Sequence, residues 1–211
     1  MNGAAVVWNG EPAWSSVEPR EVELDWGQRM ALATAEDTAR GLFLQSVLKA
    51  IRAIGDEELA RRCSLACGQG RFADFFNYPL RVLLQMFSTA MPVLAERHGA
   101  AQQSLWLLGH CVAMDFLESE AGRTMQVLVR GEARRLVTNL PWTYQVSVSG
   151  ERSVEWVGPQ ACRFTMDRDF LPPAFHEGML VAMLERLQAT QIQVQGRRRG
   201  LLGSEYDISW Q

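Results

Sequence analysis

The clearest pattern along the chain is a regular alternation of apolar and polar positions in its last third, residues 142–210. In a pleated strand every second side chain lies on the same face, so this alternation predicts short strands with one dry and one wet face. A helical pattern over residues 172–189 interrupts it, and Pro172 and Pro173 are typical of a first helical turn. The pattern therefore predicts an antiparallel sheet with one helix between its hairpins, and the helix covers the dry face. The apolar rows of the expected strands are Trp142, Tyr144, Val146 and Val148; Val154 and Trp156; Cys162, Phe164 and Met166; Ile192 and Val194; and Tyr206, Ile208 and Trp210.

The first half of the chain has apolar residues at helical spacing instead. Thr34 is a candidate cap for a first helix that ends at Gly55, and Asp56 is a candidate cap for the next. Residues 124–129 fit either a strand or a helix end. The remaining expected helices cover residues 57–67, 80–95, 100–120 and 132–140.

These elements predict an α+β fold in which a helical N-terminal half packs on a C-terminal antiparallel sheet. Residues 31–211 are expected to form a single domain, and residues 1–30 an arm packed on it. In that arm residues 4–8 fit an edge strand, and Trp14 and Trp26 are the expected anchors.

Composition narrows the class of protein. Hydrophobic residues make up 47% and charged residues 21% of the 211 residues, which is typical of a soluble globular protein. The net charge of -3 argues against a general nucleic-acid binder. The start has no signal-peptide pattern, no apolar run reaches membrane-spanning length, and the spacing of the four cysteines favours reduced thiols over a zinc site. A cytoplasmic protein is expected.

Residues 33–43, ATAEDTARGLF, resemble the opening of a paralogous family of uncharacterised myxobacterial proteins of about this length. Further matches are Tyr78-Pro79, Leu108-Gly109, Phe175-His176-Glu177-Gly178 and the closing Tyr206-Asp207-Ile208-Ser209-Trp210. The family usually has proline where this chain has Ala35. The resemblance covers most of residues 31–210 and implies a fold rather than an activity.

The order of helices, hairpin, helix and hairpin is similar to a second, more distant group. That superfamily unites heme-nitric-oxide-binding domains, vinyl-reductase-type domains and vesicle-tethering subunits. It implies a small or apolar ligand held between helices and sheet. In its heme-binding members a proximal histidine lies in a helical region comparable to that of His98, but their Tyr-x-Ser-x-Arg signature is absent here.

An aromatic cluster before the helix at residues 80–95 is the candidate ligand pocket, although a closed core uses the same residue types. Its expected lining is Phe72, Phe75, Phe76, Tyr78, Met86, Trp106 and Met114.

Candidate catalytic groups are few. His110 and Cys111 are adjacent on a helix and therefore point about 100° apart, while His176 with Glu177 suits either acid–base chemistry or an exposed first turn. The run Arg197-Arg198-Arg199 is expected at a hairpin tip, solvated or holding a phosphate.

No catalytic motif stands out, so the leading hypothesis is a non-catalytic sensory or regulatory module without a cofactor. It would bind a small apolar ligand, a partner protein, or both. The alternatives are an interaction or scaffold subunit that forms a homodimer, a heme-based gas sensor using His98, and a His/Cys enzyme.

Overall fold

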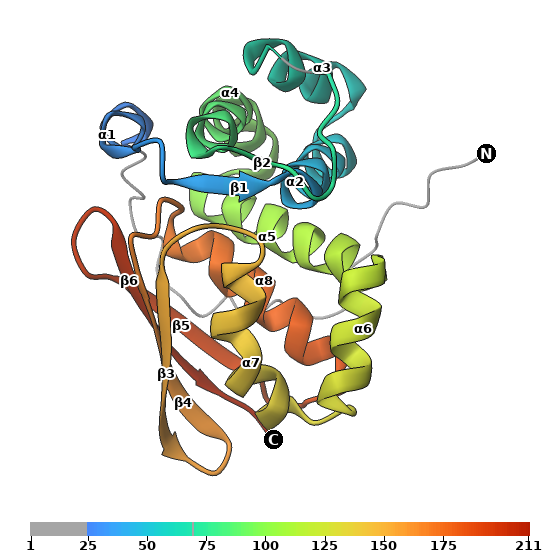
Figure 1. The fold of residues 1–211 in the computed structure, drawn as a ribbon, viewed down its shortest axis with the longest axis vertical. Helices are drawn as coiled ribbons and strands as arrows, with labels where there is room; N and C mark the ends of the chain where they lie inside the picture. Colours follow the sequence, from blue (N-terminus) through green and yellow to red (C-terminus); the bar gives the residue numbers. More distant parts are fainter. Residues whose placement is uncertain (1–24, 69) are drawn as a thin grey trace.

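The computed structural model describes residues 25–68 and 70–211. One end of the molecule is mainly helical, and the other end contains the larger sheet (Figure 1). The predictions for residues 4–8 and Trp14 lie outside the described residues. Trp26 is described: it lies on the first helix, is 8% exposed and packs against Phe87. The α+β class expected from the sequence is confirmed.

The helical end is built from four helices and one short ribbon. The ribbon pairs Thr38–Arg40 (β1) antiparallel with Asn77–Pro79 (β2). Asp56 caps its helix as predicted, since its carboxylate accepts from the Leu59 amide at 2.8 Å. The helices are α1 (Trp26–Leu32), α2 (Gly41–Ile54), α3 (Glu57–Ala66) and α4 (Leu80–His98).

The prediction that a helix begins at Thr34 is wrong. Thr34 donates from its amide and from Oγ1 to the carboxylate of Asp37, which closes a turn, and α2 begins only at Gly41. The intervening residues pair as β1 with β2, and their extended backbone is incompatible with a helix.

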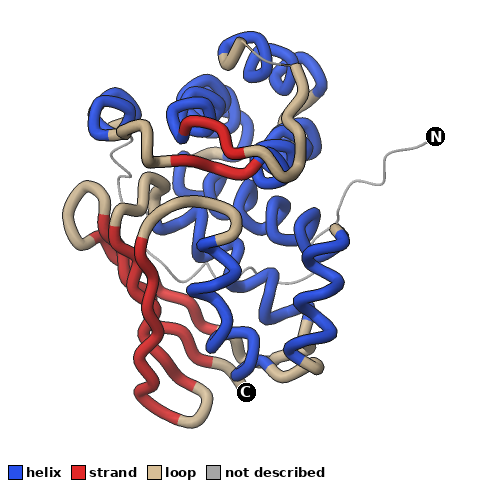
Figure 2. Tube along the Cα trace, viewed as in Figure 1, coloured by secondary structure: helices blue, strands red, loops and turns tan. Residues whose placement is uncertain are grey.

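The second half contributes four more helices to the described fold: α5 (Ala101–Glu118), α6 (Glu120–Val129), α7 (Ala133–Gln145) and α8 (Pro173–Arg186). Figure 2 shows α8 lying between α5 and the sheet. Two glycines let α5 and α8 touch: a Cβ on Gly109 would lie 1.8 Å from the Phe175 carbonyl oxygen, and one on Gly178 would lie 2.0 Å from that of Trp106. Because α8 is enclosed on both sides, most of its residues are buried.

The main sheet has strand order β3-β4-β6-β5, with every neighbouring pair antiparallel. Its inner face carries buried side chains at every second position, including Cys162, Phe164 and Met166 of β4, and α7 and α8 cover this face (Figure 1). The strands are β3 (Glu151–Gly158), β4 (Ala161–Asp167), β5 (Gln193–Arg198) and β6 (Gly203–Ser209).

The strand predicted at residues 142–148 is absent, which corrects the count of strands in this sheet. Trp142 and Tyr144 lie on α7, where Trp142 is 56% exposed and Tyr144 is 4% exposed. The buried positions of α7 follow a helical period rather than the two-residue period of a strand. Residues 124–129, for which strand and helix were both open, belong to α6.

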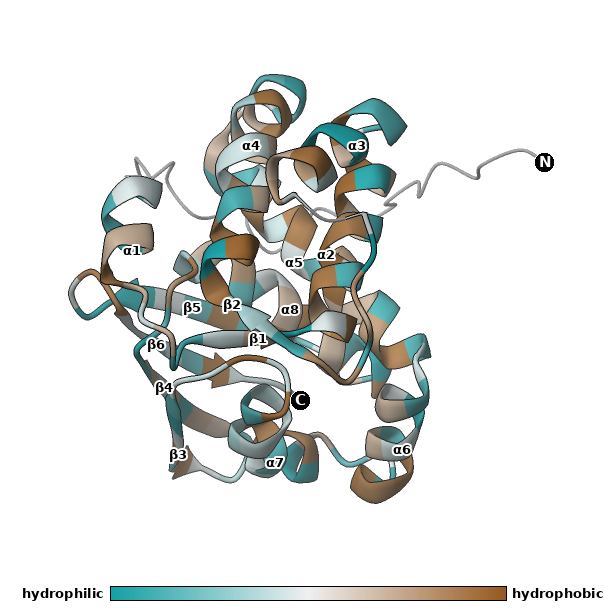
Figure 3. Cartoon of the chain, turned by 45° about the horizontal axis from the view of Figure 1, so that its top comes forward, coloured by the Kyte–Doolittle hydropathy of each residue, from teal (hydrophilic) through white to brown (hydrophobic). Residues whose placement is uncertain are grey.

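A short seam joins the two ends, which we call the junction: residues 34–40 of the helical end against residues 147–149 and Arg168 of the sheet end. The amide of Arg40 donates to the Ser147 carbonyl at 2.8 Å, and the amide of Ser149 donates to the Thr38 carbonyl at 3.0 Å. One cluster of buried apolar residues continues through both ends. Apolar surface remains on α6, where Val127 and Leu128 are 76% and 61% exposed (Figure 3).

Candidate functional site

Beside the junction the described residues line a small cavity of about 20 Å³. It lies where α2, α5, α7 and α8 meet, and its wall is almost entirely apolar. A cavity needs roughly 10–15 Å³ to hold one water molecule, so this space fits one small molecule. The lining residues are Phe43, Phe116, Thr143, Tyr144, Ser147, Val148, Met179 and Met183.

Local structure explains how these side chains converge. Met179 and Met183 are four residues apart on α8 and therefore point from the same side of that helix. Ser147 and Val148 follow the end of α7 in the junction, where Val148 forms an isolated bridge with Ala39 of β1. Methionine side chains are flexible and adapt to irregular spaces. The cavity wall therefore combines two adaptable side chains with backbone that also joins the two ends.

Tyr144 is one of three hydroxyl-bearing residues in the cavity wall, with Thr143 and Ser147. Its hydroxyl lies 3.3 Å from Nδ1 of His176 and 3.9 Å from Sδ of Met179. Burial raises the pKa of Tyr144 far above its usual value, so the hydroxyl stays protonated. It is therefore a fixed hydrogen-bonding group at the edge of an apolar space.

Behind Tyr144 lies a fully buried polar network. Nε2 of His176 donates to Oδ1 of Asp169 at 3.0 Å, and Ser204 Oγ donates to Oδ2 at 2.7 Å. The Tyr206 hydroxyl donates to Ser204 Oγ at 3.0 Å. Burial raises the pKa of Asp169, but the charge and hydrogen bond of His176 and the bonds from Ser204 and the Leu171 amide bring it below its usual value. A buried carboxylate with every oxygen bonded rigidifies the region behind the cavity.

The seven residues predicted to line a pocket do not line this cavity. Phe75 and Phe76 are 81% and 68% exposed, whereas Met86 is fully buried on α4 and Trp106 stacks on His110 of α5. Phe72 and Tyr78 do meet, edge to face, with ring centroids 5.0 Å apart. Met114 is half-buried on α5.

The candidate histidines and cysteine are held in separate places. His98 is the last residue of α4, and its Nε2 lies 2.9 Å from the carbonyl of Ile54, the last residue of α2. His110 Nε2 bonds Glu185 at 2.9 Å, and burial raises the pKa of the neighbouring Cys111 thiol. A nucleophilic cysteine acts as the thiolate, and the raised pKa keeps Cys111 in its thiol form.

The other cysteines are packing groups. Cys63 and Cys67 donate weak bonds to carbonyls of α4, and burial raises the pKa of both thiols to about 11. Among the described residues no three His, Cys, Asp or Glu side chains are grouped so as to hold a metal ion.

The arginine run lies at the end of β5, and only its last residue, Arg199, falls in the connection to β6, which corrects the prediction for Arg197 and Arg198. Arg197 and Arg198 belong to β5, and Arg197 pairs with Glu205 and Asp207 of β6, the latter at 2.5 Å. Arg163 also contacts Asp207 at 3.0 Å. Arg197 is therefore held between two carboxylates of β6.

Sequence reasoning missed the cavity because it assigned Tyr144 to a strand and placed Met179 and Met183 only as an apolar stripe of α8. The methionine spacing was the one available signal, since it puts two adaptable side chains on one side of a helix.

Comparisons with known proteins agree with this fold. Residues 32–211 match the model of a family described as "Protein of unknown function (DUF2378)". No curated protein matches the chain. Within the described residues, no helix has the length and apolar character that crossing a membrane requires.

Solved structures with a similar fold are H-NOX domains. An oxygen binding H-NOX domain related to soluble guanylate cyclases is 11% identical, with a TM-score of 0.63 over 82% of this chain and 95% of that one. An H-NOX protein from S. oneidensis in the Fe(II)NO ligation state is 12% identical, with a TM-score of 0.61 over 82% of this chain and 99% of that one. At this level of identity the likeness shows the fold alone.

Proposed function

This chain belongs to the DUF2378 family, and we propose that it is a non-catalytic sensory or regulatory module that holds a small apolar ligand beside the junction. The observation that carries the proposal is the cavity lined by Tyr144, Met179 and Met183, because it lies between the two ends of the molecule. Val148 lines the cavity and also bridges to β1. A ligand that displaced the cavity wall would therefore act directly on the contact between the ends.

The fold likeness supports a ligand between helices and sheet, since the similar H-NOX structures carry oxygen or nitric oxide in their descriptions. Fold alone does not fix function. The cavity adds a specific site to that analogy, with a mainly apolar wall and the hydroxyl-bearing residues Thr143, Tyr144 and Ser147 among its lining, groups of the kind that orient small ligands.

A heme does not fit the residues present. The cavity measures about 20 Å³, whereas sites for ligands of drug size or larger need roughly 300 Å³ or more. The three histidines of the chain are His98, His110 and His176, and none of them lines the cavity. Each ring already bonds a carbonyl or a carboxylate. We therefore propose a ligand of a few heavy atoms.

Xenon is a suitable first probe, because it occupies apolar cavities without needing a polar partner. With methyl-labelled methionines, xenon pressure is expected to shift the resonances of Met179 and Met183 while leaving Met86 and Met91 unchanged. Those two are buried on α4 away from the cavity and serve as controls. Unshifted Met179 and Met183 signals, together with native mass spectrometry showing no co-purified small molecule, would remove the ligand from the proposal.

A second candidate function, an interaction subunit that forms a homodimer, has its own supporting observation. Phe75 and Phe76 are exposed, yet their loop is held in place. The carbonyl of Phe75 accepts from Arg40 at 3.0 Å, and that of Phe76 accepts from the Gly41 amide at 2.9 Å. Aromatic side chains presented on an ordered backbone are typical of binding hot spots.

Sedimentation velocity over a wide concentration range tests this second candidate. If Phe75 and Phe76 form the contact, replacing both with serine should abolish a dimer that the wild-type chain forms. The same change at Val127 and Leu128, the exposed pair on α6, should leave the dimer intact. A wild-type chain that stays monomeric would exclude self-assembly.

A further inference from the structure

Arg29 is a buried cation with hydrogen-bond donors that none of the described residues satisfies. It lies on α1 with 1% of its surface exposed. Its Nε and Nη1 atoms are buried and have no hydrogen-bond partner among residues 25–68 and 70–211. Burying a guanidinium without an acceptor is strongly unfavourable, so such a group usually marks a missing partner.

A second arginine stands beside it. Arg198 ends β5 and lies opposite Ser204 of β6 in the register, so the two side chains share the inner face of the sheet. Arg198 lowers the pKa of Arg29 by charge repulsion, after the larger effect of burial. Two like charges are therefore close together, and one of them is buried.

The nearest carboxylates do not accept hydrogen bonds from Nε or Nη1 of Arg29. Asp169 raises the pKa of Arg29 and so lies near it. However, Oδ1 of Asp169 accepts from His176 and the Leu171 amide, and Oδ2 accepts from Ser204. Asp25 is also near, but it accepts no bond from Nε or Nη1 of Arg29. Neither carboxylate therefore accepts a hydrogen bond from the open donors of Arg29.

The rest of the same cross-sheet row adds positive charge. Ser204 pairs with Met166 of β4, and Met166 pairs with Arg152 of β3, so arginines stand at both ends of this row. Arg152 also has a buried Nε without a partner. Its charge, like that of Arg29, interacts with Asp169 and Tyr206. A second guanidinium with an unpartnered Nε therefore lies on the same row of the inner face.

We propose that Arg29, with Arg198 beside it, binds an oxyanion: a carboxylate or a phosphate group. An oxyanion supplies acceptors for the unpartnered donors of Arg29 and a charge opposite to that of its guanidinium, and guanidinium groups match it in geometry. Arg198 is exposed, so it can meet an anion that arrives from solvent. None of these residues lines the cavity beside the junction, so the anion site does not depend on the proposed function.

Two sources of this chemistry are possible, a free oxyanion and the head group of an amphipathic ligand, and the experiment separates them. Thermal unfolding is followed while inorganic phosphate, acetate or octanoate is added at constant ionic strength set with sodium chloride. A saturable rise in Tm with phosphate or acetate indicates a free oxyanion. A rise with octanoate at concentrations at least about tenfold lower than with acetate indicates a head group, since each buried methylene strengthens binding.

Variants assign the effect to the site. Arg29→Met should abolish the saturable rise, Arg198→Met should weaken binding by about tenfold, and Arg62→Met, an exposed arginine on α3, should bind like the wild type. If Arg29→Met fails to fold, the site is tested by anion binding to Arg198→Met and by the Nε–H resonance of Arg29 in the wild type. That resonance is expected to shift as anion is added. No anion-specific rise in Tm, or a rise with an unmoved Arg29 resonance, overturns the proposal.

Discussion

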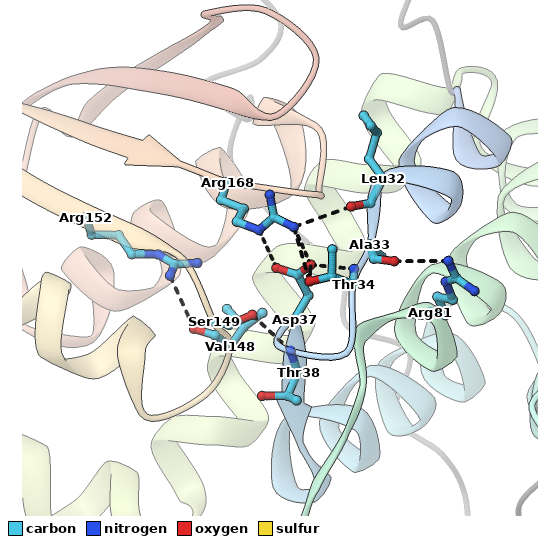
Figure 4. Close-up of polar contacts among 10 residues, drawn as sticks. All are labelled: Leu32, Ala33, Thr34, Asp37, Thr38, Arg81, Val148, Ser149, Arg152 and Arg168. Carbon is cyan, nitrogen blue, oxygen red and sulfur yellow. Dashed lines mark hydrogen bonds and ion pairs between the residues drawn. The ribbon is translucent and has the colours of Figure 1, made fainter.

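Arg168 and Asp37 form a two-point ion pair across the junction, with Nε 2.6 Å from Oδ1 and Nη2 2.6 Å from Oδ2 (Figure 4). Asp37 has a side chain that is 2% exposed, while that of Arg168 is 43% exposed. Thr34 donates to the same carboxylate, and Arg81 holds the neighbouring Ala33 carbonyl at 3.0 Å. The pair therefore fixes the turn of the helical end against the end of β4.

Asp37→Asn should destabilise the protein, because it removes the charge that a buried carboxylate shares with Arg168. The expected loss is about 1–2 kcal/mol, less than for a fully buried pair because Arg168 is partly screened by water. Urea unfolding measures it. Glu58→Gln, which breaks the exposed pair between Glu58 and Arg61, is the control and should leave the midpoint unchanged.

The free energy of unfolding at acid pH should depend on the ionisation of Asp37 and Asp169. Burial raises the pKa of Asp37, but hydrogen bonds from Arg168 and Thr34 bring it below its usual value, and the pKa of Asp169 is also lowered. A carboxyl whose folded pKa is depressed stabilises the fold above its unfolded pKa. That contribution is lost as the pH falls through the folded value. Unfolding free energy should therefore drop below about pH 4, and Asp37→Asn should flatten the drop. An unchanged slope in the variant would contradict this assignment.

Gly109→Ala and Gly178→Ala should each cost about 3 kcal/mol or more, since the added Cβ would overlap a carbonyl oxygen of the facing helix. Backbone on both sides leaves no flexible side chain to move away. Gly27→Ala on α1 is the matched control, because a Cβ there meets nothing within 4 Å. Thermal or urea unfolding compares the three, and a mild effect at Gly109 and Gly178 would mean that α5 and α8 lie further apart.

Tyr144→Phe removes the hydroxyl and keeps the ring against Phe164. Nδ1 of buried His176 then loses its neighbour, which is expected to cost about 1–2 kcal/mol. Urea unfolding reports this loss, and the His176 ring resonances should shift in NMR spectra. Tyr78→Phe, in which the Ala73 amide loses its acceptor on a partly exposed loop, should cost less.

The cysteines should react slowly with thiol reagents at neutral pH, because burial raises the pKa of Cys111 and raises those of Cys63, Cys67 and Cys162 to about 11. Labelling rates followed by mass spectrometry should rise with pH and on addition of denaturant. A fast reaction of native Cys111 at neutral pH would contradict this prediction and support the alternative of a His/Cys enzyme.

Much of the fold was predictable because its signals are local. The helices predicted at residues 80–95, 100–120 and 172–189 match α4 (Leu80–His98), α5 (Ala101–Glu118) and α8 (Pro173–Arg186) closely. The apolar rows of β4 and β6 face inward as the alternation required. Each of these patterns is set by the geometry of a single element, so the neighbouring residues along the chain suffice to read it.

The candidate site was not predictable in the same way. Tyr144 and His176 are 32 residues apart, and their contact depends on how α7 and α8 pack on the sheet. Residues 142–148 alternate like a strand, yet the helical burial of Leu136, Leu140 and Tyr144 decides their structure. No local pattern distinguishes these outcomes.

The sequence by itself determined the α+β class, the main helices, and which side of each inner strand is apolar, because side-chain direction follows from backbone periodicity. Only the tertiary structure decided that Tyr144 borders a cavity, that Asp37 meets Arg168, and that Arg29 is buried with open donors. These facts depend on the distance between elements far apart in the chain, which packing sets and periodicity does not encode.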